Sequence, residues 1–307
     1  MEKFKLYFIF SLIFTASSPS WSAVISYDIS GFYSETYNSN ILGLAVNPEN
    51  NEIFFSSLSY RGGDNFWRLN SSGELIDSSR VDYDYGTAGN LGELVFGIGG
   101  SLFASATYYD VSTRTVTHSL LELTTDGSVV SNSSMSNTAG LTYNTDESSL
   151  MALSGVFGSG AHPEETVLIS NDGLISSYFS LVDDRYPYDL AYNAINSNLY
   201  TVLGGILNEY TLDTSGYDLI NQFDLTLLPG VSGASLAIDI NQATGRFYIQ
   251  NNNRRIVSFE RSDLTVYVEP DDPVITVPEP PVLALIVAGI VGLGFLPRNA
   301  SSNLKFH

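Results

Sequence analysis

The sequence predicts an all-β protein built from repeated four-stranded units, a β-propeller, and three observations lead to this fold class. Short apolar segments recur at nearly constant spacing. The same succession of strands and turns follows each of them. The recurring segment is apolar at consecutive positions, which is typical of a strand buried on both faces. Its aligned leucines are Leu44, Leu94, Leu141, Leu190 and Leu236, at intervals of 50, 47, 49 and 46 residues.

Each repeat continues with three further strands. A polar turn leads from the leucine segment into a second strand, a third strand follows, and a Gly-containing turn introduces a weaker fourth strand. Gly supplies the positive φ that such turns require. Four antiparallel strands in about 48 residues make one propeller blade, whereas a sandwich would not repeat and a β-helix has a shorter coil. The Gly turns are Ser72-Gly73, Asp126-Gly127, Asp172-Gly173 and Ser215-Gly216.

The five repeats predict five blades within residues 23–268, or six if a degenerate blade lies in the N-terminal stretch. A propeller ring must close, because open ends would leave strand edges unpaired and exposed. Residues 24–30 read as a strand without a repeat of its own. We therefore expect this strand to pair with the last blade near residues 255–259.

Residues 1–22 have the composition of a secretory signal peptide. Lys3 and Lys5 form a basic start, residues 6–14 are apolar, and Ser20 and Ser22 offer small residues for cleavage. An N-terminal membrane anchor would need a longer apolar run. The sequence therefore predicts that the chain is exported.

The C-terminal region divides into a linker and an apolar segment. Residues 269–281 are rich in Pro and acidic residues and read as an extended linker, and residues 282–296 contain no charge. Fifteen helical residues extend roughly 22 Å, less than the ~30 Å of a bilayer core. Arg298 and Lys305 follow the apolar run, while acidic residues precede it, which predicts a cytoplasmic C-terminus. A buried core helix is the alternative, but this segment has no polar face.

The linker ends with Val277, Pro278, Glu279 and Pro280, followed by the apolar segment and Arg298. This succession resembles the PEP-CTERM family of bacterial sorting signals over about the last thirty residues. In that family a V-P-E-P motif precedes a short apolar helix and a basic end, and an exosortase processes it. The resemblance implies an exosortase-type partner and delivery to the cell surface or beyond. It also implies that residues 282–307 form an apolar membrane helix with a basic tail, which anchors the chain until processing. A GPI signal would instead end within its apolar run.

The charge balance excludes two classes of partner. The chain has 13 Lys and Arg against 33 Asp and Glu, and residues 24–281 contain no Lys. So acidic a surface repels nucleic acid and anionic lipid. There is no Cys, which excludes disulfides and thiolate metal sites. The composition suits an exported domain that is stabilised by its core.

Two carboxylates are candidates for chemistry in the central channel. The positions before the aligned leucines are Gly43, Glu93, Gly140, Asp189 and Ser235. If the alignment holds, Glu93 and Asp189 lie at one level and could share a cation or act as an acid–base pair. Alternatively, each carboxylate caps a turn or faces solvent. The repeats are similar in rhythm to NHL, gluconolactonase-like and surface-layer propellers, but Asn144 and Asn193, which a lactonase-like metal site would use, are expected at the opposite end of their strands.

The other chemical candidates lack a recognisable pattern. No ligand spacing for zinc and no nucleophile elbow is present, so no metal ligand set is assigned. Paired carboxylates in two loops could hold Ca²⁺ but lack calcium-loop spacing, and solvated loops are the better interpretation. Four tyrosines could stack on sugar rings or pack between blades. These residues are His118, His162 and His307; Asp82, Asp84, Asp183 and Asp184; and Tyr83, Tyr85, Tyr108 and Tyr109.

Two functions from different classes are consistent with the sequence. The first is a non-catalytic exported protein that binds or scaffolds at the cell surface or in extracellular polysaccharide. The alternative is a divalent-metal-dependent propeller hydrolase or lactonase using Glu93 and Asp189. The absence of a catalytic constellation in the sequence favours the first.

Overall fold

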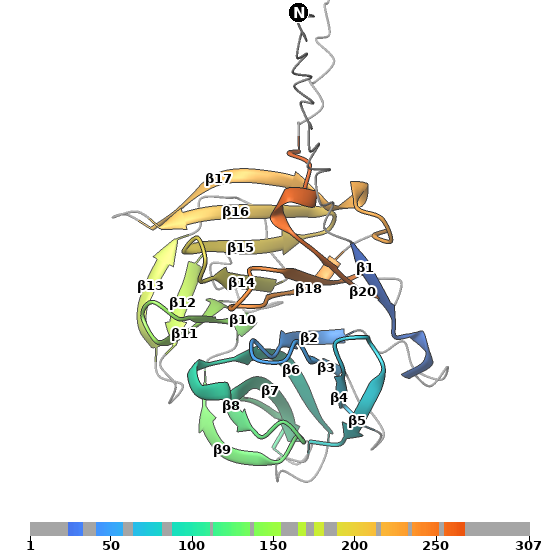
Figure 1. Ribbon diagram of the computed structural model, residues 1–307. Helices are drawn as coiled ribbons and strands as arrows, with labels where there is room; N and C mark the ends of the chain where they lie inside the picture. Colours follow the sequence, from blue (N-terminus) through green and yellow to red (C-terminus); the bar gives the residue numbers. More distant parts are fainter. Residues whose placement is uncertain are drawn as a thin grey trace, which may run out of the picture. The chain divides into compact units, whose positions relative to one another are not determined.

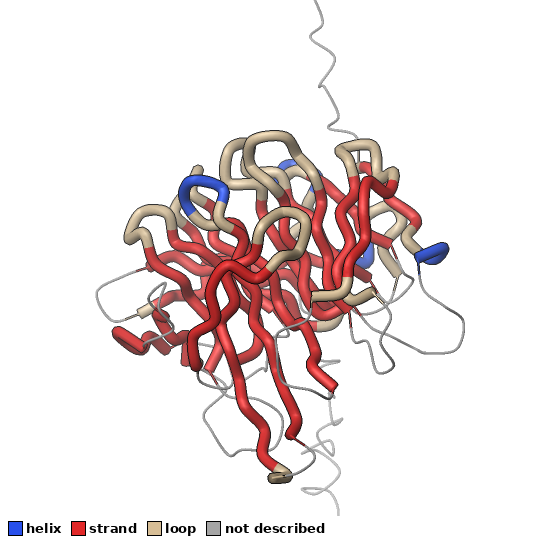
Figure 2. Tube along the Cα trace, turned by 90° about the horizontal axis from the view of Figure 1, so that it is seen from below, coloured by secondary structure: helices blue, strands red, loops and turns tan. Residues whose placement is uncertain are grey.

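The computed structural model describes residues 24–32, 41–57, 64–81, 88–110, 113–135, 138–154, 165–169, 175–180, 189–212, 216–232, 235–251 and 255–267. The chain divides into two units, Met1–Tyr267 and Val268–His307, and all described residues belong to the first. The predicted signal peptide, the predicted linker and the predicted sorting motif (Val277–Pro280 and Arg298) lie outside the described residues. Within the described ranges, no helix is long and apolar enough to cross a membrane. The helical segments are short turns (Figure 2).

The fold is all-β, and the described strands form five four-stranded antiparallel sheets, the blades of a propeller (Figure 1). The first strand of each blade is called the inner strand below. In chain order the blades are β2 (Ile41–Val46), β3 (Ile53–Ser57), β4 (Phe66–Leu69) and β5 (Leu75–Ser79); β6 (Ala88–Phe96), β7 (Leu102–Asp110), β8 (Thr115–Leu123) and β9 (Val129–Ser134); β10 (Thr138–Asn144), β11 (Ser149–Ser154), β12 (Glu165–Ile169) and β13 (Ile175–Ser180); β14 (Asp189–Asn193), β15 (Asn198–Leu203), β16 (Ile206–Leu212) and β17 (Tyr217–Asp224); and β18 (Ser235–Ile240), β19 (Phe247–Asn251) and β20 (Arg255–Phe259) with β1 (Ile25–Asp28).

The ring closes as the sequence predicts. Strand β1 pairs antiparallel with β20, with Ile25 opposite Ser258 and Asp28 opposite Arg255. Each inner strand lies against the next, from β2 through β6, β10, β14 and β18 back to β2. The N-terminal strand thus completes the fifth blade and leaves no gap in the ring.

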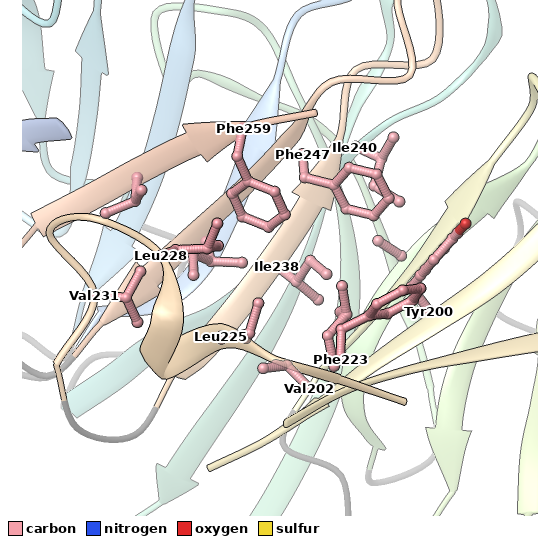
Figure 3. Packing of buried hydrophobic residues seen from close by; sticks show 14 residues of the cluster. Tyr200, Val202, Phe223, Leu225, Leu228, Val231, Ile238, Ile240, Phe247 and Phe259 are labelled. Atoms are coloured by element: carbon pink, nitrogen blue, oxygen red, sulfur yellow. The ribbon is translucent and has the colours of Figure 1, made fainter. Parts of the chain in front are cut away.

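The hydrophobic core consists of clusters that lie between neighbouring blades. On β14, Leu190 and Tyr192 belong to the cluster shared with the third blade, whereas Ala191 belongs to the cluster shared with the fifth blade. This is why inner strands are apolar at consecutive positions. Between the fourth and fifth blades, Tyr200 meets Phe247 edge to face, with ring centroids 4.9 Å apart. Figure 3 shows these side chains pointing toward one another.

The predicted alignment is wrong by two residues in the fifth blade. Leu44, Leu141 and Leu190 pair with Phe55, Ala152 and Thr201, each eleven residues further along the chain. In the fifth blade the pair with this separation is Ile238 and Ile249, so Ile238 rather than Leu236 is the equivalent residue. The register shift between Ser235 and Ala237 supports this alignment, because the first blade has the equivalent shift between Ile41 and Gly43. Because side chains alternate with a period of two along a strand, a slip of two residues leaves the apolar pattern unchanged.

A shared turn follows the inner strand in four blades. The side chain of an Asn accepts a hydrogen bond from the backbone N–H two residues later, at 2.9 Å each time, and so fixes the turn. Four residues after the Asn, the backbone has positive φ. In the second blade Gly99 and Gly100 adopt positive φ instead. The capping residues are Asn47, Asn144, Asn193 and Asn241, and the positive-φ residues are Asn51, Ser148, Ser197 and Gly245.

The chain after β20 returns to the fourth blade. The N–H of Asp224 donates to the carbonyl oxygen of Thr265 at 3.1 Å, and the N–H of Tyr267 donates to the carbonyl oxygen of Gln222 at 2.7 Å. Phe223 and Val266 form an antiparallel bridge between them. The last described residues therefore extend the outer edge of the fourth blade at β17.

Candidate functional site

The predicted channel carboxylates lie at the same level on two inner strands. Glu93 on β6 and Asp189 on β14 each precede the aligned leucine of their blade, as do Gly43 and Gly140. In the fifth blade this position belongs to Ala237, so the expectation for Ser235 is wrong for the same reason as that for Leu236. Asp189 is only 1% exposed, whereas Glu93 is half-buried.

Asp189 connects neighbouring blades through backbone hydrogen bonds. Its Oδ2 accepts the N–H of Ile238 in the fifth blade at 2.8 Å, and its Oδ1 accepts the N–H of Leu190 at 2.8 Å. The N–H of Leu141 in the third blade also donates to this carboxyl group. Inner strands have one edge without a sheet partner, and their buried N–H groups need acceptors. The Asp189 side chain provides that acceptor for three adjacent blades.

Two further polar side chains accept backbone N–H groups of a neighbouring blade, and this role was not predicted from the sequence. Asp239 Oδ2 accepts the N–H of Val46 at 2.6 Å, which links the fifth blade to the first. Thr142 Oγ1 accepts the N–H of Tyr192 at 2.8 Å, which links the third blade to the fourth. Thr142 and Asp239 both come directly after the aligned residue of their inner strand. A polar residue inside an otherwise apolar strand was the available sequence signal.

Burial controls the titration of these carboxyl groups. It raises the pKa of Asp189 well above its ordinary value, against the opposing effect of the backbone hydrogen bonds. Burial, and then the charge of Asp189, raise the pKa of Glu93 well above its ordinary value. Burial raises the pKa of Asp239 to about 8, although the N–H groups of Val46 and Ile240 oppose it. The three groups therefore favour their protonated forms in the folded ring.

Close approach of inner strands depends on glycine beside the acidic positions. A Cβ at Gly43 would lie 2.6 Å from Glu93 Cα and 2.7 Å from Leu94 N. A Cβ at Gly140, whose φ is +66°, would lie 2.9 Å from Asp189 Oδ1 and 3.1 Å from Asp189 Cα. Each acidic residue thus packs directly against a glycine of the preceding blade.

Replacing Gly140 with alanine is expected to reduce the free energy of unfolding by about 2–4 kcal/mol. The new methyl group would meet the backbone of Asp189, and a residue other than glycine is strained at positive φ. Urea denaturation of the purified domain would measure the change. Gly99→Ala is the matched control, because Gly99 has φ +76° but open space around its Cβ position. Equal stability losses in both variants would contradict a role for close packing at Gly140.

The chemistry available to Glu93 and Asp189 is limited by these contacts. Both oxygens of Asp189 accept backbone hydrogen bonds, and no group of three or more acidic or His side chains within the described ranges could hold a metal ion. A cation shared by Glu93 and Asp189 stays a prediction. Asn144 and Asn193 lie at the other end of the inner strands from that pair, as expected, where they cap turns.

The remaining sequence candidates separate into two groups. His118 Nδ1 lies 3.1 Å from Thr107 Oγ1 on the neighbouring strand, and burial lowers its pKa. Tyr108 is 9% exposed and belongs to the core between the first and second blades, so it packs between blades rather than offering its ring to a sugar. The side chain of Tyr109 and all of His162, His307, Asp82, Asp84, Asp183, Asp184, Tyr83 and Tyr85 lie outside the described residues.

Two solved structures are similar to this chain at low sequence identity. No protein-family model and no curated protein matches the chain. A chain of a mitotic checkpoint complex crystal structure aligns with TM-score 0.42 and 11% identity, covering 85% of this chain and 98% of that one. A chain of a nidogen–laminin complex aligns with TM-score 0.43 and 12% identity, covering 75% and 84%. Likenesses at this level carry no argument about function.

Proposed function

We propose that this propeller is an exported, non-catalytic binding or scaffold protein of the cell surface or extracellular matrix. The proposal rests on the observation that polar side chains on the inner strands bind backbone groups of neighbouring blades. Asp189, Asp239 and Thr142 direct their oxygens to backbone N–H groups of neighbouring blades. These side chains hold the ring together, which leaves the turns and outer surfaces of the blades for binding a partner.

Delivery through a PEP-CTERM-type signal is part of the proposal and rests on the sequence. Val277, Pro278, Glu279 and Pro280, the apolar segment and Arg298 would be recognised by an exosortase-type enzyme after the signal peptide has directed export. The apolar segment would hold the protein in the membrane until processing. The acidic, Lys-free body fits secreted polysaccharide as a partner better than nucleic acid, which it would repel.

The intact mass of the protein from its native cells tests this delivery. We expect a mass that lacks residues 1–22 and everything beyond about Pro280, in the surface or extracellular fraction. Glu279→Ala is expected to retain the tail and stay with the membrane, whereas Glu269→Ala, an acidic residue of the linker outside the motif, should be processed normally. A wild-type protein that keeps residues 282–307 in the membrane would overturn exosortase processing and indicate a plain anchor.

A divalent-metal-dependent hydrolase or lactonase is the second candidate, and the position of Glu93 and Asp189 at the same level of two inner strands favours it. This function requires both carboxyl groups to be ionised and to bind a divalent cation such as Ca²⁺. It also requires Asp189 to lose some of its hydrogen bonds to backbone N–H groups. Glu93→Gln would then abolish turnover of lactones or glycans. A melting temperature unaffected by Ca²⁺, Mg²⁺ and Zn²⁺ would remove the basis of this candidate.

A further inference from the structure

A pocket of about 250 Å³ lies between the third and fourth blades, beside the Asn-capped turns that follow their inner strands. It lies at the end of the inner strands away from Glu93 and Asp189, and neither residue lines it. Its walls come from both blades. The lining residues are Asn144, Asp146 and Glu147 of the third blade, and Tyr192, Asn196, Ser197, Thr211 and Tyr217 of the fourth.

Hydrogen bonds between the two blades fix the acidic wall of this pocket. Asp146 Oδ2 accepts the hydroxyl of Tyr192 at 2.6 Å and the hydroxyl of Ser197 at 2.8 Å. Asn144 stabilises the turn that contains Asp146, because its Oδ1 accepts the N–H groups of Asp146 and Glu147. These hydrogen bonds from Tyr192 and Ser197 also lower the pKa of Asp146, so its carboxylate is ionised. A wall ordered before binding reduces the entropy that a ligand must lose.

The pocket offers charged acceptors next to hydroxyl donors. Asp146 and Glu147 are carboxylates, and none of the described residues that line the pocket is Lys, Arg or His. The hydroxyl of Tyr217 stays protonated, since burial and then the charge of Glu147 raise its pKa. Thr211 adds a second hydroxyl. The hydroxyl of Tyr217 donates to Met151 Sδ at 3.7 Å, and the amide of Asn196 donates to the hydroxyl of Tyr200 at 2.8 Å. An anion would be repelled here, whereas adjacent hydroxyl groups of a ligand could donate to the carboxylates and accept from the hydroxyl of Thr211.

We propose that this inter-blade pocket binds one neutral sugar residue of a larger saccharide. The proposal rests on the binding role proposed above and gives it a site and a ligand class. The volume is just below the roughly 300 Å³ at which pockets for drug-sized ligands begin, which suits a single ring. A Ca²⁺ ion fits less well, because it needs six to eight oxygen ligands and Asp146 Oδ2 already accepts two hydroxyl groups.

Ligand-observed NMR and titration calorimetry on the purified protein test the proposal. The probes are glucose, galactose, mannose and N-acetylglucosamine at up to about 10 mM, a range that detects millimolar affinity, with glucuronic acid as the anionic comparison. We expect at least one neutral sugar to bind and glucuronic acid to bind at least tenfold more weakly. Glu147→Gln should weaken the neutral sugar by about tenfold or more. Glu147 is exposed, so this variant is expected to fold normally.

Glu49→Gln is the matched control, because Glu49 occupies in the first blade the turn position that Asp146 occupies in the third. It should bind like the wild type. A protein that binds its own cells' polysaccharide equally well with and without Glu147→Gln would overturn the pocket and leave the proposed function standing. Absence of binding to every neutral sugar would also overturn the pocket. The proposed function fails by a different result, namely turnover of a lactone or glycan, or retention of the protein inside the cell.

Discussion

Replacing Arg261 with alanine is expected to lower the free energy of unfolding by about 2–3 kcal/mol, because it leaves a buried carboxylate without its cation. Arg261 lies just after β20, and its Nη2 is 2.6 Å from Oε2 of Glu209 on β16. The side chain of Glu209 is 1% exposed and that of Arg261 is 48% exposed. We place the cost below that of a fully buried pair because water reaches the arginine.

The surroundings of Glu209 explain why the loss is substantial. Its Oε1 accepts the hydroxyl of Tyr200 at 2.5 Å and the amide of Asn198 at 2.8 Å, while the amide of Asn221 donates to Oε2 at 2.7 Å. Burial raises the pKa of Glu209, but these hydrogen bonds and those from Arg261 outweigh it, so the pKa lies below its ordinary value. The network thus stabilises the ionised carboxylate inside the blade.

The Arg261 variant should also change how stability depends on pH. A carboxyl group whose folded pKa is depressed stabilises the protein above its unfolded pKa, and this contribution is lost as pH falls. The deficit of Arg261→Ala should therefore be larger at pH 7 than at pH 4. Urea denaturation at both values measures it, with the exposed Arg255→Ala as control. Equal stability of the two variants at pH 7 would contradict the predicted role of the ion pair.

Arg261→Ala should also weaken the pairing of the last described residues, 265–267, with β17. Residues 265–267 pair with Gln222, Phe223 and Asp224 of β17, and Arg261 anchors the turn that precedes them. Hydrogen exchange at the Tyr267 amide, which donates to the Gln222 carbonyl oxygen, is expected to speed up in Arg261→Ala and to be unchanged in Arg255→Ala.

The repeat and the ring closure could be predicted because each depends on a pattern of neighbouring residues in the sequence. Leu44, Leu141 and Leu190 mark inner strands through consecutive apolar residues, and residues 25–28 had strand character with no partner in their own repeat. The fifth blade was misaligned because Leu236 and Ile238 fit the same apolar alternation. The Asn-capped turn would have resolved it, since Asn241 follows Ile238 by the same three residues that separate Asn193 from Leu190.

The hydrogen-bond partners of the polar residues could not be predicted from local sequence patterns. The level of Asp189 followed from the repeat, but the N–H of Ile238, which donates to its Oδ2, belongs to a backbone 49 residues away. Glu209 looked like one more polar position on an alternating strand, and its partner Arg261 is 52 residues further along the chain. Such contacts depend on how blades are packed, which no local pattern records.

Asp239→Asn is expected to make the protein more stable at pH 8 and to flatten its stability between about pH 4 and pH 8. Burial raises the pKa of Asp239 to about 8 from an ordinary value of 3.8. Between these values the folded state holds a proton that the unfolded state has released. Unfolding then releases a proton, so the stability of the wild type falls as pH rises, by up to about 1.4 kcal/mol per pH unit.

Asparagine is the informative replacement because its carbonyl oxygen can still accept the N–H of Val46, 2.6 Å from Asp239 Oδ2. The variant keeps the link between the fifth and first blades but has no charge to bury. Urea denaturation at pH 5, 6, 7 and 8 should give a shallower decline for Asp239→Asn than for the wild type, with Glu49→Gln as an exposed control. Asp189 and Glu93, whose pKa values are also raised, would leave a residual decline of the same sign. Stability that rises with pH equally in all three proteins would mean that Asp239 is ionised in the folded ring, and that the N–H groups of Val46 and Ile240 outweigh its burial.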